Sequence, residues 1–446
     1  MVTPFRHDVP GTPASLWAER PEWEHVKQAE LDDFDRVVVV AAHPDDETLG
    51  AGGLIATASA GSIDVHLFLC TAGERSHPGS TTHLPEDLAA VRQAEVRSAL
   101  GELAPRAAVT LLEVPDGQLR DHEQALVDLL VRLVDDGRRT LVVAPWREDG
   151  HPDHDAAGRA AATAAQRTGA TLWEYPIWWW HWAEPEAAPW GNLRQLDLTE
   201  DARARRGRAL AHHRSQTEPL SDAPGDEALL RPDFLRHFSG PSERFVLQET
   251  RDDALDRLHG DERDPWGVDE RHYELRKRHL SLAMLPRDRF CRGLEVGCSV
   301  GALTADLAHR CDALVAVDSS AAAVGAARQR LATDGSGSGV ELRHAQLPAA
   351  WPDGLFDLIV LSEVGYFLSP RDLDELVERV RESLTEDGVL LLCHWQGPVV
   401  GWVLDGAQVH RTVEDAEVRP VQARYRERDF EAIVLCADAA WPDVDA

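Results

Sequence analysis

The sequence has few cysteines and lacks any apolar run long enough to cross a membrane. Its six cysteines among 446 residues show no CxxC spacing, which argues against a disulfide framework or a cysteine-ligated structural metal. We interpret them as reduced core residues of a cytoplasmic protein. No stretch approaches the roughly 20 apolar residues of a membrane-spanning helix, and residues 1–13 lack an apolar leader segment. We therefore predict no secretion signal and no membrane partner.

Basic residues are scarce relative to acidic ones. The chain has 46 Lys and Arg against 77 Asp and Glu, a formal net charge of −31. Nucleic acids and anionic membrane surfaces carry charge of the same sign, so the balance argues against both as partners. With these two classes of partner excluded, we expect the partner to be a small-molecule substrate. The length exceeds that of a usual single core and predicts two domains.

The most informative stretch joins an apolar run to a polar cluster. Residues 37–40 are four consecutive valines, and residues 43–47 read His-Pro-Asp-Asp-Glu. The β-branched run predicts a strand buried on both faces. The polar cluster then lies at the carboxyl end of that strand, where open α/β sheets bind ligands. The segment from Gly50 to Gly53, with Leu54 and Ile55, is expected to start a helix that packs back on the sheet.

A second stretch repeats this arrangement about 100 residues later. The apolar residues 140–145 lead into residues 149–154, which read Asp-Gly-His-Pro-Asp-His. Two parallel strands ending side by side would let His43, Asp46 and His154 supply two nitrogens and one oxygen to one divalent metal. Three protein ligands with an open position are typical of a catalytic zinc site, and the same ligands suit Fe²⁺.

Two motifs carry a family resemblance. AHPDDE at residues 42–47 and HPDH at residues 151–154 resemble the signatures of the PIG-L/LmbE family of zinc-dependent N-deacetylases. The family implies a Rossmann-like fold and the three metal ligands already named. It also implies that Asp45 is the general base and that His151 steadies or protonates the tetrahedral intermediate. Asp153 is expected to orient His151.

Residues around the expected cleft suggest a substrate class. Six tryptophans crowd residues 173–190. They could stack on a sugar ring, or they could form a cap that closes the cleft by packing alone, and we prefer the cap. Glu74, Arg75 and Asp116 are candidates for binding sugar hydroxyls.

The second half of the chain begins a new pattern. Residues 292–301 predict a strand that turns through glycines into a helix, and the next strand, residues 313–317, ends at Asp318. Glycine turn, helix, strand and terminal acid together indicate an adenosine-containing cofactor. Both NAD and S-adenosylmethionine fit this geometry.

Further segments resemble class I S-adenosylmethionine-dependent methyltransferases. Residues 264–266, 356–366 and 393–395 are similar to the NodS-type N-methyltransferases, which act on an amine of a glucosamine unit. Two positions depart from the wider class: a serine stands at the middle glycine, and a glutamine stands at the adenine position. The predicted cofactor-binding residues are Glu295, Gly297, Ser299, Gly301, Asp318, Ser319, Gln346, Leu347 and Glu363.

The methyl acceptor requires a group that orients it or takes its proton, because an alkylamine is mostly protonated at neutral pH. Glu363, Tyr366 and His394 are candidates for this role. Each could equally serve packing or hydrogen bonding at a strand end.

The sequence thus predicts two Rossmann-like α/β domains, each a mostly parallel sheet covered by helices. We expect an arm at residues 1–34, a deacetylase domain at 35–248, a linker at 249–264 and a methyltransferase domain at 265–446. The leading hypothesis is that the first domain deacetylates an N-acetylated amino sugar or similar molecule, and that the second methylates the freed nitrogen. The alternatives are that the domains act on different atoms or substrates, or that the chain is a non-catalytic sensor.

Overall fold

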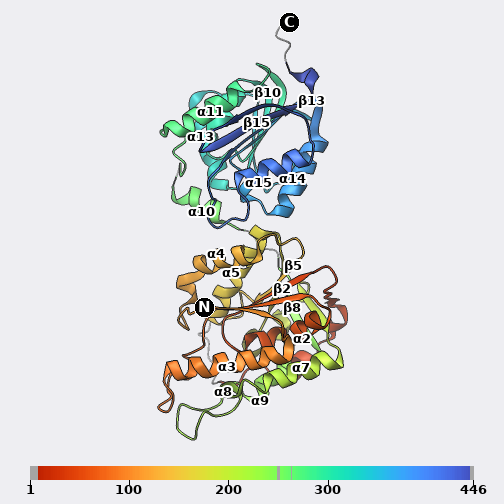
Figure 1. Ribbon diagram of the computed structural model, residues 1–446, viewed down its shortest axis with the longest axis vertical. Coiled ribbons are helices and arrows are strands. Elements are labelled where there is room, and N and C mark those ends of the chain that lie inside the picture. The colour runs from red at the N-terminus through yellow and green to blue at the C-terminus, as the bar shows by residue number, and fades with distance from the viewer. Residues whose placement is uncertain (1–8, 249–251, 263, 442–446) are drawn as a thin grey trace. The chain divides into compact units, whose positions relative to one another are not determined.

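The computed structural model describes residues 9–248, 252–262 and 264–441, and it divides into two compact units. Unit 1 is Met1–Thr250 and unit 2 is Arg251–Ala446. Both contain a twisted sheet with helices against it (Figure 1). None of the helices in these described ranges has the length and apolarity needed to cross a bilayer.

Unit 1 is built on an eight-stranded sheet in the order β1-β7-β8-β6-β5-β2-β3-β4. Strands β6, β5, β2, β3 and β4 are parallel neighbours, whereas β8 runs antiparallel to β6 and β7. The strands are β1 Lys27–Gln28, β2 Arg36–Ala41, β3 Asp64–Leu69, β4 Ala108–Leu111, β5 Thr140–Pro145, β6 Thr171–Tyr175, β7 Leu193–Asp197 and β8 Ser242–Val246.

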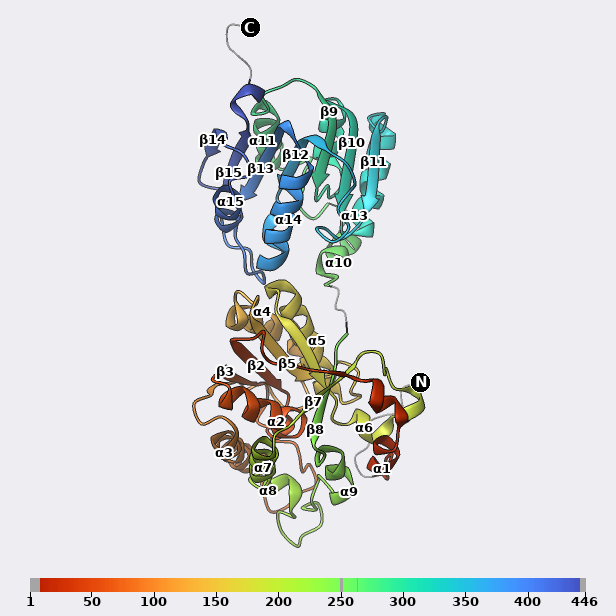
Figure 2. The same cartoon turned by 90° about the vertical axis from the view of Figure 1, so that its right-hand side faces the viewer.

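Helices cover both faces of this sheet, with α4 and α5 on one face and α2, α3 and α7 on the other (Figures 1 and 2). The central valines of β2 are fully buried, as the apolar run predicts. The helices are α1 Ala14–Ala18, α2 Asp46–Ala60, α3 Pro85–Leu103, α4 Glu123–Val134, α5 Pro152–Thr168, α6 Trp179–Trp182, α7 Glu200–Leu210, α8 Arg214–Thr217 and α9 Pro232–Leu235.

The start of α2 was predicted wrongly. The helix begins at Asp46, four residues before the glycine-containing segment that we expected to start it. These glycines serve close packing inside the helix. A Cβ on Gly50 would lie 2.1 Å from the Tyr175 ring, and one on Gly53 would lie 2.9 Å from the Glu243 carboxylate.

Unit 2 is built on a seven-stranded sheet in the order β11-β10-β9-β12-β13-β15-β14. The first five strands are parallel neighbours, and β15 pairs antiparallel with β13 and β14. The strands are β9 Phe290–Val296, β10 Cys311–Asp318, β11 Val340–His344, β12 Phe356–Ser362, β13 Leu384–Trp395, β14 Val421–Arg426 and β15 Phe430–Cys436.

Alternate residues of β12 face different helices, as the pleat of a strand requires. Ile359 and Leu361 share a core cluster with α14 and α15, whereas Leu358 and Val360 pack with residues of α11 and α12. The helices are α10 Ala254–Asp261, α11 His272–Ala283, α12 Ala302–Ala308, α13 Ala321–Asp334, α14 Pro370–Ser383 and α15 Gly406–Asp415. The predicted fold class, two mostly parallel α/β units, is confirmed.

The segment that we expected to link the domains contains a helix with contacts in unit 2. The Ser320 hydroxyl at the start of α13 donates a hydrogen bond of 2.7 Å to Asp256 of α10. The predicted linker at residues 249–264 includes four residues that lie outside the described ranges. The domain boundaries that we drew stay a prediction.

Candidate active sites

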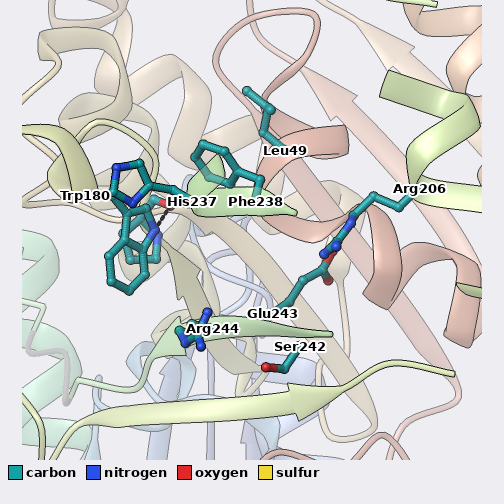
Figure 3. A pocket seen from close by; sticks show the side chains of 10 residues that line it. Leu49, Trp180, Arg206, His237, Phe238, Ser242, Glu243 and Arg244 are labelled. Carbon is teal, nitrogen blue, oxygen red and sulfur yellow. Dashed lines mark hydrogen bonds and ion pairs between the residues drawn. The ribbon is translucent and has the colours of Figure 1, made fainter. Parts of the chain in front are cut away.

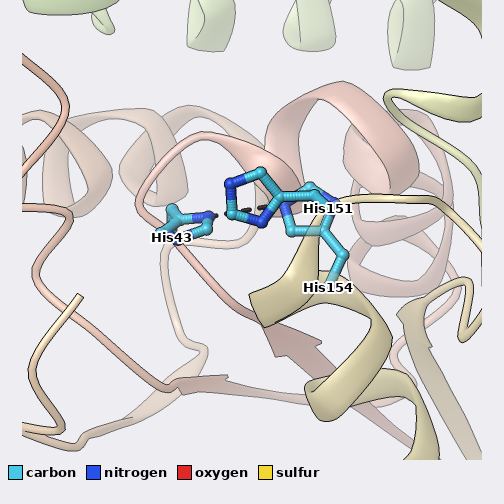
Figure 4. Close-up of side chains that lie close together, drawn as sticks. All are labelled: His43, His151 and His154. Atoms are coloured by element: carbon cyan, nitrogen blue, oxygen red, sulfur yellow. Dashed lines mark hydrogen bonds between the residues drawn. The ribbon is translucent and has the colours of Figure 1, made fainter. Parts of the chain in front are cut away.

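The carboxyl ends of β2 and β5 bring the two predicted motifs together in unit 1. These strands are hydrogen-bonded parallel neighbours, so the loops that follow them leave the same edge of the sheet. His43 follows β2, and His154 lies in the first turn of α5 after β5. Figure 4 shows the imidazoles of His43, His151 and His154 close together.

The predicted ligand atoms converge. The Nδ1 atom of His43 lies 3.3 Å from Nε2 of His154. The Asp46 carboxylate contacts both rings, at 3.5 Å from His43 Nδ1 and 3.3 Å from His154 Nε2. All three side chains are buried. The His151 ring is a neighbour, with its centroid 4.6 Å from that of His154 and 5.0 Å from that of His43.

In His43 and in His154, the ring nitrogen that points away from the other histidine contacts carboxylates; we call it the outward nitrogen. The Nε2 atom of His43 lies 3.1 Å from Asp116 and 3.3 Å from Asp153, and Nδ1 of His154 lies 2.7 Å from Asp149. A ring that donates its outward N–H to a carboxylate presents a lone pair on its other nitrogen. This orientation leaves His43 Nδ1 and His154 Nε2 as acceptors, so the residues fit a divalent ion.

Three sequence predictions are altered by these contacts. The Asp153 carboxylate lies on His43 and not on His151, so its predicted partner was wrong; it also accepts the backbone N–H groups of residues 117 and 119. Asp116 contacts His43 and accepts the N–H of Arg75, although it also lines the cavity. Glu74 accepts the N–H of Asp116.

Asp45 has a strained backbone and an unusual environment. Its φ of 136° lies in a region that residues with a side chain rarely adopt. Arg92 holds the segment by donating to Asp45 at 3.2 Å, to the Pro44 carbonyl at 2.7 Å and to the Gly73 carbonyl at 2.8 Å. Burial raises the pKa of Asp45 to about 6, although Arg92 opposes the shift. A carboxylate with such a pKa suits a general base near neutral pH.

The pKa values of the two neighbouring histidines differ. Burial lowers the pKa of His154, but the carboxylates of Asp46 and Asp149 outweigh it and raise that pKa to about 10. Burial, together with the nearby His154 and His43, holds the pKa of His151 well below its usual value. The carboxylates thus attract positive charge to the His43 and His154 side of the site.

Two cavities in unit 1 differ tenfold in volume. One, of about 200 Å³, is lined by Asp45, His151, Arg75 and Trp178 among others. The other, of about 20 Å³, has room for about one water. It adjoins an ion pair of 3.3 Å between Arg206 and Glu243, whose side chains point toward each other in Figure 3. The larger cavity is the candidate substrate site.

The tryptophan-rich segment mostly packs away from this cavity. Trp178 lines the cavity, whereas Trp179 and Trp180 pack with Trp17 at ring-centroid distances of 4.7 and 4.9 Å. Trp182 donates its indole N–H to the Asp149 carbonyl. The packing role that we preferred therefore describes the buried members of this segment, and Trp178 alone among these four lines the cavity.

Sequence reasoning missed the roles of two buried charged residues. Asp149 contacts His154 and accepts the N–H groups of Ile177, Trp178 and Trp179 at 2.7 to 3.0 Å. Arg92, in α3, holds the segment around Asp45 through three hydrogen bonds. The available signals were an acidic residue four residues after a buried strand and an arginine among the apolar positions of a helix.

The predicted methyl-donor residues gather at the carboxyl ends of β9 and β10 in unit 2. Gly297, Ser299 and Gly301 have φ values of 76°, 47° and 78°, so the loop after β9 turns tightly. Asp318 ends β10 and accepts the N–H groups of Ser299 and Ser320 at 2.8 and 2.9 Å. Of the remaining predicted residues, Ser319 follows Asp318, and Gln346 and Leu347 follow the adjacent β11.

Buried polar atoms at this loop lack partners among the described residues. These atoms are Glu295 Oε2 and Ser299 Oγ. Burial raises the pKa of Glu295 to about 8. Because buried polar groups are nearly always hydrogen-bonded, unsatisfied atoms beside a tight glycine turn fit a polar organic ligand such as S-adenosylmethionine.

The contacts of His394, a candidate substrate residue, match the alternative role of hydrogen bonding at a strand end. Its side chain is fully buried. Its Nε2 accepts the N–H of Gly365 at 3.3 Å, and its Nδ1 lies 3.1 Å from His410 Nε2. Both ring nitrogens are therefore used within the protein, and His394 supports the loop after β12 from behind.

Comparisons with known proteins separate the two units. Residues 38–165 match the family model described as PIG-L, GlcNAc-PI de-N-acetylase, and residues 248–400 match the model for nodulation protein S (NodS). A 1D-myo-inositol 2-acetamido-2-deoxy-alpha-D-glucopyranoside deacetylase from Rhodococcus opacus (strain B4) is 30% identical over 198 residues, which cover 37% of this chain and 67% of the relative.

The relatives of unit 2 are methyltransferases. Nodulation protein S from Rhizobium tropici is 36% identical over 107 residues, covering 24% of this chain and 43% of that relative. The structure of N-methyltransferase NodS from Bradyrhizobium japonicum WM9 with S-adenosyl-L-homocysteine is 22% identical, with a TM-score of 0.37 and coverage of 42% and 97%. The predicted enzyme classes, a deacetylase followed by an S-adenosylmethionine-dependent methyltransferase, are confirmed. The chain thus belongs to the PIG-L de-N-acetylase family through unit 1 and carries a NodS-type methyltransferase domain as unit 2.

Proposed function

We propose that this enzyme removes an acetyl group from the nitrogen of an amino sugar and then methylates the freed amine. The observation that carries the first step is the convergence of His43, Asp46 and His154 beside Asp45 and an open cavity. Relatives of unit 1 are named as deacetylases of 2-acetamido-2-deoxyglucosyl compounds, and the NodS relative is named as an N-methyltransferase. Hydrolysis of an N-acetyl group yields the kind of nitrogen that an N-methyltransferase uses.

The residues of unit 1 divide the work of amide hydrolysis. His43, Asp46 and His154 would hold a divalent ion, zinc or iron, which supplies Lewis-acid activation of water and of the amide carbonyl. Asp45 takes a proton from the attacking water, and Arg92 fixes its carboxylate. His151, on the cavity wall and kept neutral by its lowered pKa, donates a hydrogen bond to the developing oxyanion. Asp45 then passes the proton it has taken to the leaving nitrogen.

Other cavity residues position the sugar. Trp178 offers an aromatic face on which a sugar ring can pack, and Arg75 offers a guanidinium for hydroxyl groups. Asp116 can accept from a hydroxyl while it holds His43, because each carboxylate oxygen has two lone pairs. These three side chains would orient the acetamide toward Asp45.

In unit 2, the loop after β9 and the end of β10 would hold S-adenosylmethionine, which supplies the methyl group. Gly297 and Gly301 allow the backbone to approach the donor closely, and Asp318 lies where it can accept from ribose hydroxyls. The unsatisfied Glu295 and Ser299 atoms would gain partners when the donor binds.

The proposal is tested with a matched pair of substrates. The full chain is given N-acetylglucosamine or glucosamine derivatives together with isotopically labelled methyl donor, and the products are mapped by mass spectrometry. We expect label on the nitrogen of the free amine, and on the acetylated substrate only after acetyl loss. Equal labelling of the acetylated form at another atom would contradict the sequential reaction and favour two independent activities.

A further inference from the structure

Five buried and half-buried side chains form a charged cluster at the end of β12 in unit 2. We call this group, Tyr273, Glu274, Lys277, Glu363 and Tyr366, the Glu363 cluster. Tyr366 donates a hydrogen bond of 2.5 Å to Glu363 Oε2. Lys277 Nζ lies 2.9 Å from Glu274 Oε2 and 3.5 Å from Glu363 Oε1. Lys277 is only 5% exposed, so these contacts form in surroundings with little water.

The cluster contains more negative than positive charge. Two carboxylates face one ammonium, and the Lys277 ammonium also lies 4.8 Å from the centre of the Tyr273 ring. Glu363 Oε1 and the Tyr273 hydroxyl are buried without a hydrogen-bond partner among the described residues. A buried charge is costly unless it is paired and hydrogen-bonded. One more cation that donates hydrogen bonds would therefore balance the charge of the cluster.

The cluster adjoins the loop that would hold the methyl donor. Strand β12 pairs in parallel with β9, with Leu361 opposite Val296. A Cβ on Gly297 would lie 2.9 Å from the Val364 side chain, so the residue after Glu363 packs directly on the glycine turn. Glu363 itself has a φ of 59°, a conformation that turns the chain sharply at this point.

An aromatic group lies beside the same segment. The Phe367 ring centroid is 4.7 Å from Tyr366, 5.2 Å from Trp402 and 6.4 Å from Trp266. These rings are partly exposed, apart from the buried Tyr366. A ligand whose cation reached Glu363 would have apolar surface available for the part of the molecule next to its amine.

We propose that the Glu363 cluster is the acceptor site of the methyltransferase and binds a primary or secondary ammonium carried on a ring with an apolar face. Glu363 contacts the ammonium and takes its proton, and Lys277 is a positioning residue that keeps Glu363 ionised. The inference rests on the methyltransferase function proposed above. The sequence suggested two roles for Glu363, one at the methyl donor and one at the acceptor. The inference assigns Glu363 to the acceptor.

The chemical step balances with the groups named. The ammonium gives one proton to the Glu363 carboxylate and becomes a neutral amine. Its nitrogen lone pair forms the new N–C bond as the C–S bond of the sulfonium breaks, and those electrons stay on sulfur. The methylated product is again an ammonium, and the proton on Glu363 leaves to water.

Binding to the full chain loaded with S-adenosyl-L-homocysteine tests this assignment. The probes are glucosamine and N-acetylglucosamine, measured by calorimetry, because they differ in the charged amine. We expect wild type to prefer glucosamine at least tenfold, and E363Q to lose that preference while its affinity for S-adenosyl-L-homocysteine changes less than twofold. Binding that remains in E363Q is assigned to unit 1.

The pH dependence tests the positioning role of Lys277. Burial raises the pKa of Glu363, and Lys277 opposes this shift. K277M should therefore raise the acidic limit, which is the pH below which the preference for glucosamine is lost. The other titratable groups near this pair are Glu274, Tyr273, Tyr366, Cys393 and His394. K277R should restore the wild-type limit. R276M is the matched control, because it removes the neighbouring charge that faces Glu427. It should leave the acidic limit at the wild-type pH.

Three results would overturn the inference. If E363Q binds glucosamine as tightly as wild type does, the Glu363 cluster is not an ammonium site. A tenfold loss of S-adenosyl-L-homocysteine affinity in E363Q would return Glu363 to the donor site. An unchanged acidic limit in K277M would show that Lys277 does not position Glu363 or keep it ionised. If wild type fails to bind S-adenosyl-L-homocysteine at all, the methyltransferase proposal itself fails, which is a separate outcome.

Discussion

The two sites satisfy their buried polar groups in opposite ways. In unit 1, the outward nitrogens of His43 and His154 are held by carboxylates, and Asp149 in turn accepts three backbone N–H groups. In unit 2, Glu295 Oε2 and Ser299 Oγ are buried without partners among the described residues. The residues of the proposed metal site are therefore oriented by the protein alone, whereas the buried atoms of the proposed methyl-donor site would gain partners only from a ligand.

The largest expected effect follows from removing the base in unit 1. Asp45→Asn should lower kcat for deacetylation by about 10³-fold, since general bases contribute about 10² to 10⁴. Methyl transfer to a free amine should be unchanged, because that chemistry lies in unit 2. Rates of acetate release and methyl incorporation are the measurements. Asp135→Asn, at an exposed residue that also has a positive φ, is the control, and full deacetylase activity in Asp45→Asn would exclude the assigned role.

A smaller effect is expected from loosening the orientation of His154. Asp149→Asn replaces the carboxylate that faces Nδ1, and partners of this kind are worth about 10- to 100-fold in metal affinity. Metal content after dialysis against a graded chelator measures the change. The exposed Asp136→Asn serves as the comparison. Wild-type metal retention in Asp149→Asn would show that the site does not depend on this contact.

The smallest effect concerns stability and sharpens the description of unit 2. The pKa of Glu295 is raised to about 8 by burial, from 4.5 for a free side chain. Its contribution to stability is therefore complete below about pH 4.5 and is lost as the pH rises toward 8, because the unfolded chain releases the proton first. The loss is at most about 1.4 kcal/mol per pH unit. Thermal unfolding of wild type and E295Q without ligand between pH 5 and 8 measures it.

We expect the stability of wild type to fall relative to E295Q across that range. The control E386Q changes an exposed carboxylate on β13 and should leave the difference from wild type constant with pH. Parallel pH profiles for wild type and E295Q would mean that Glu295 ionises normally in the folded protein. The contrast between a satisfied and an unsatisfied site would then lose its main support in unit 2.

The sequence was sufficient to place candidate site residues wherever the local residue pattern fixes their position at the end of a strand. A valine run and a second apolar run both ended in polar motifs, and parallel pairing of the two strands then placed His43, Asp46 and His154 together. The glycine turn and Asp318 were likewise found from strand ends. Such features depend on the sheet alone, since the carboxyl ends of parallel strands share an edge.

Side-chain partners across the fold were harder to predict. Asp153 was assigned to His151 because the two are close in sequence, yet its carboxylate reaches His43 from the other motif. His394 carried a polar signal at a strand end, but α15 places His410 against it and buries the ring. The start of α2 was placed at the glycine segment, whereas the helix begins at Asp46 and Gly50 lies inside it against Tyr175. These partners are set by tertiary packing.

The most direct test of the account locates the ion itself. Crystals of the full chain, grown with zinc or iron, can be measured by anomalous diffraction at the corresponding absorption edge. We predict one peak in unit 1, within bonding distance of His43 Nδ1, Asp46 and His154 Nε2. A peak on the other side of the His43 ring, between Nε2, Asp116 and Asp153, or no peak in protein that still deacetylates, would contradict the account.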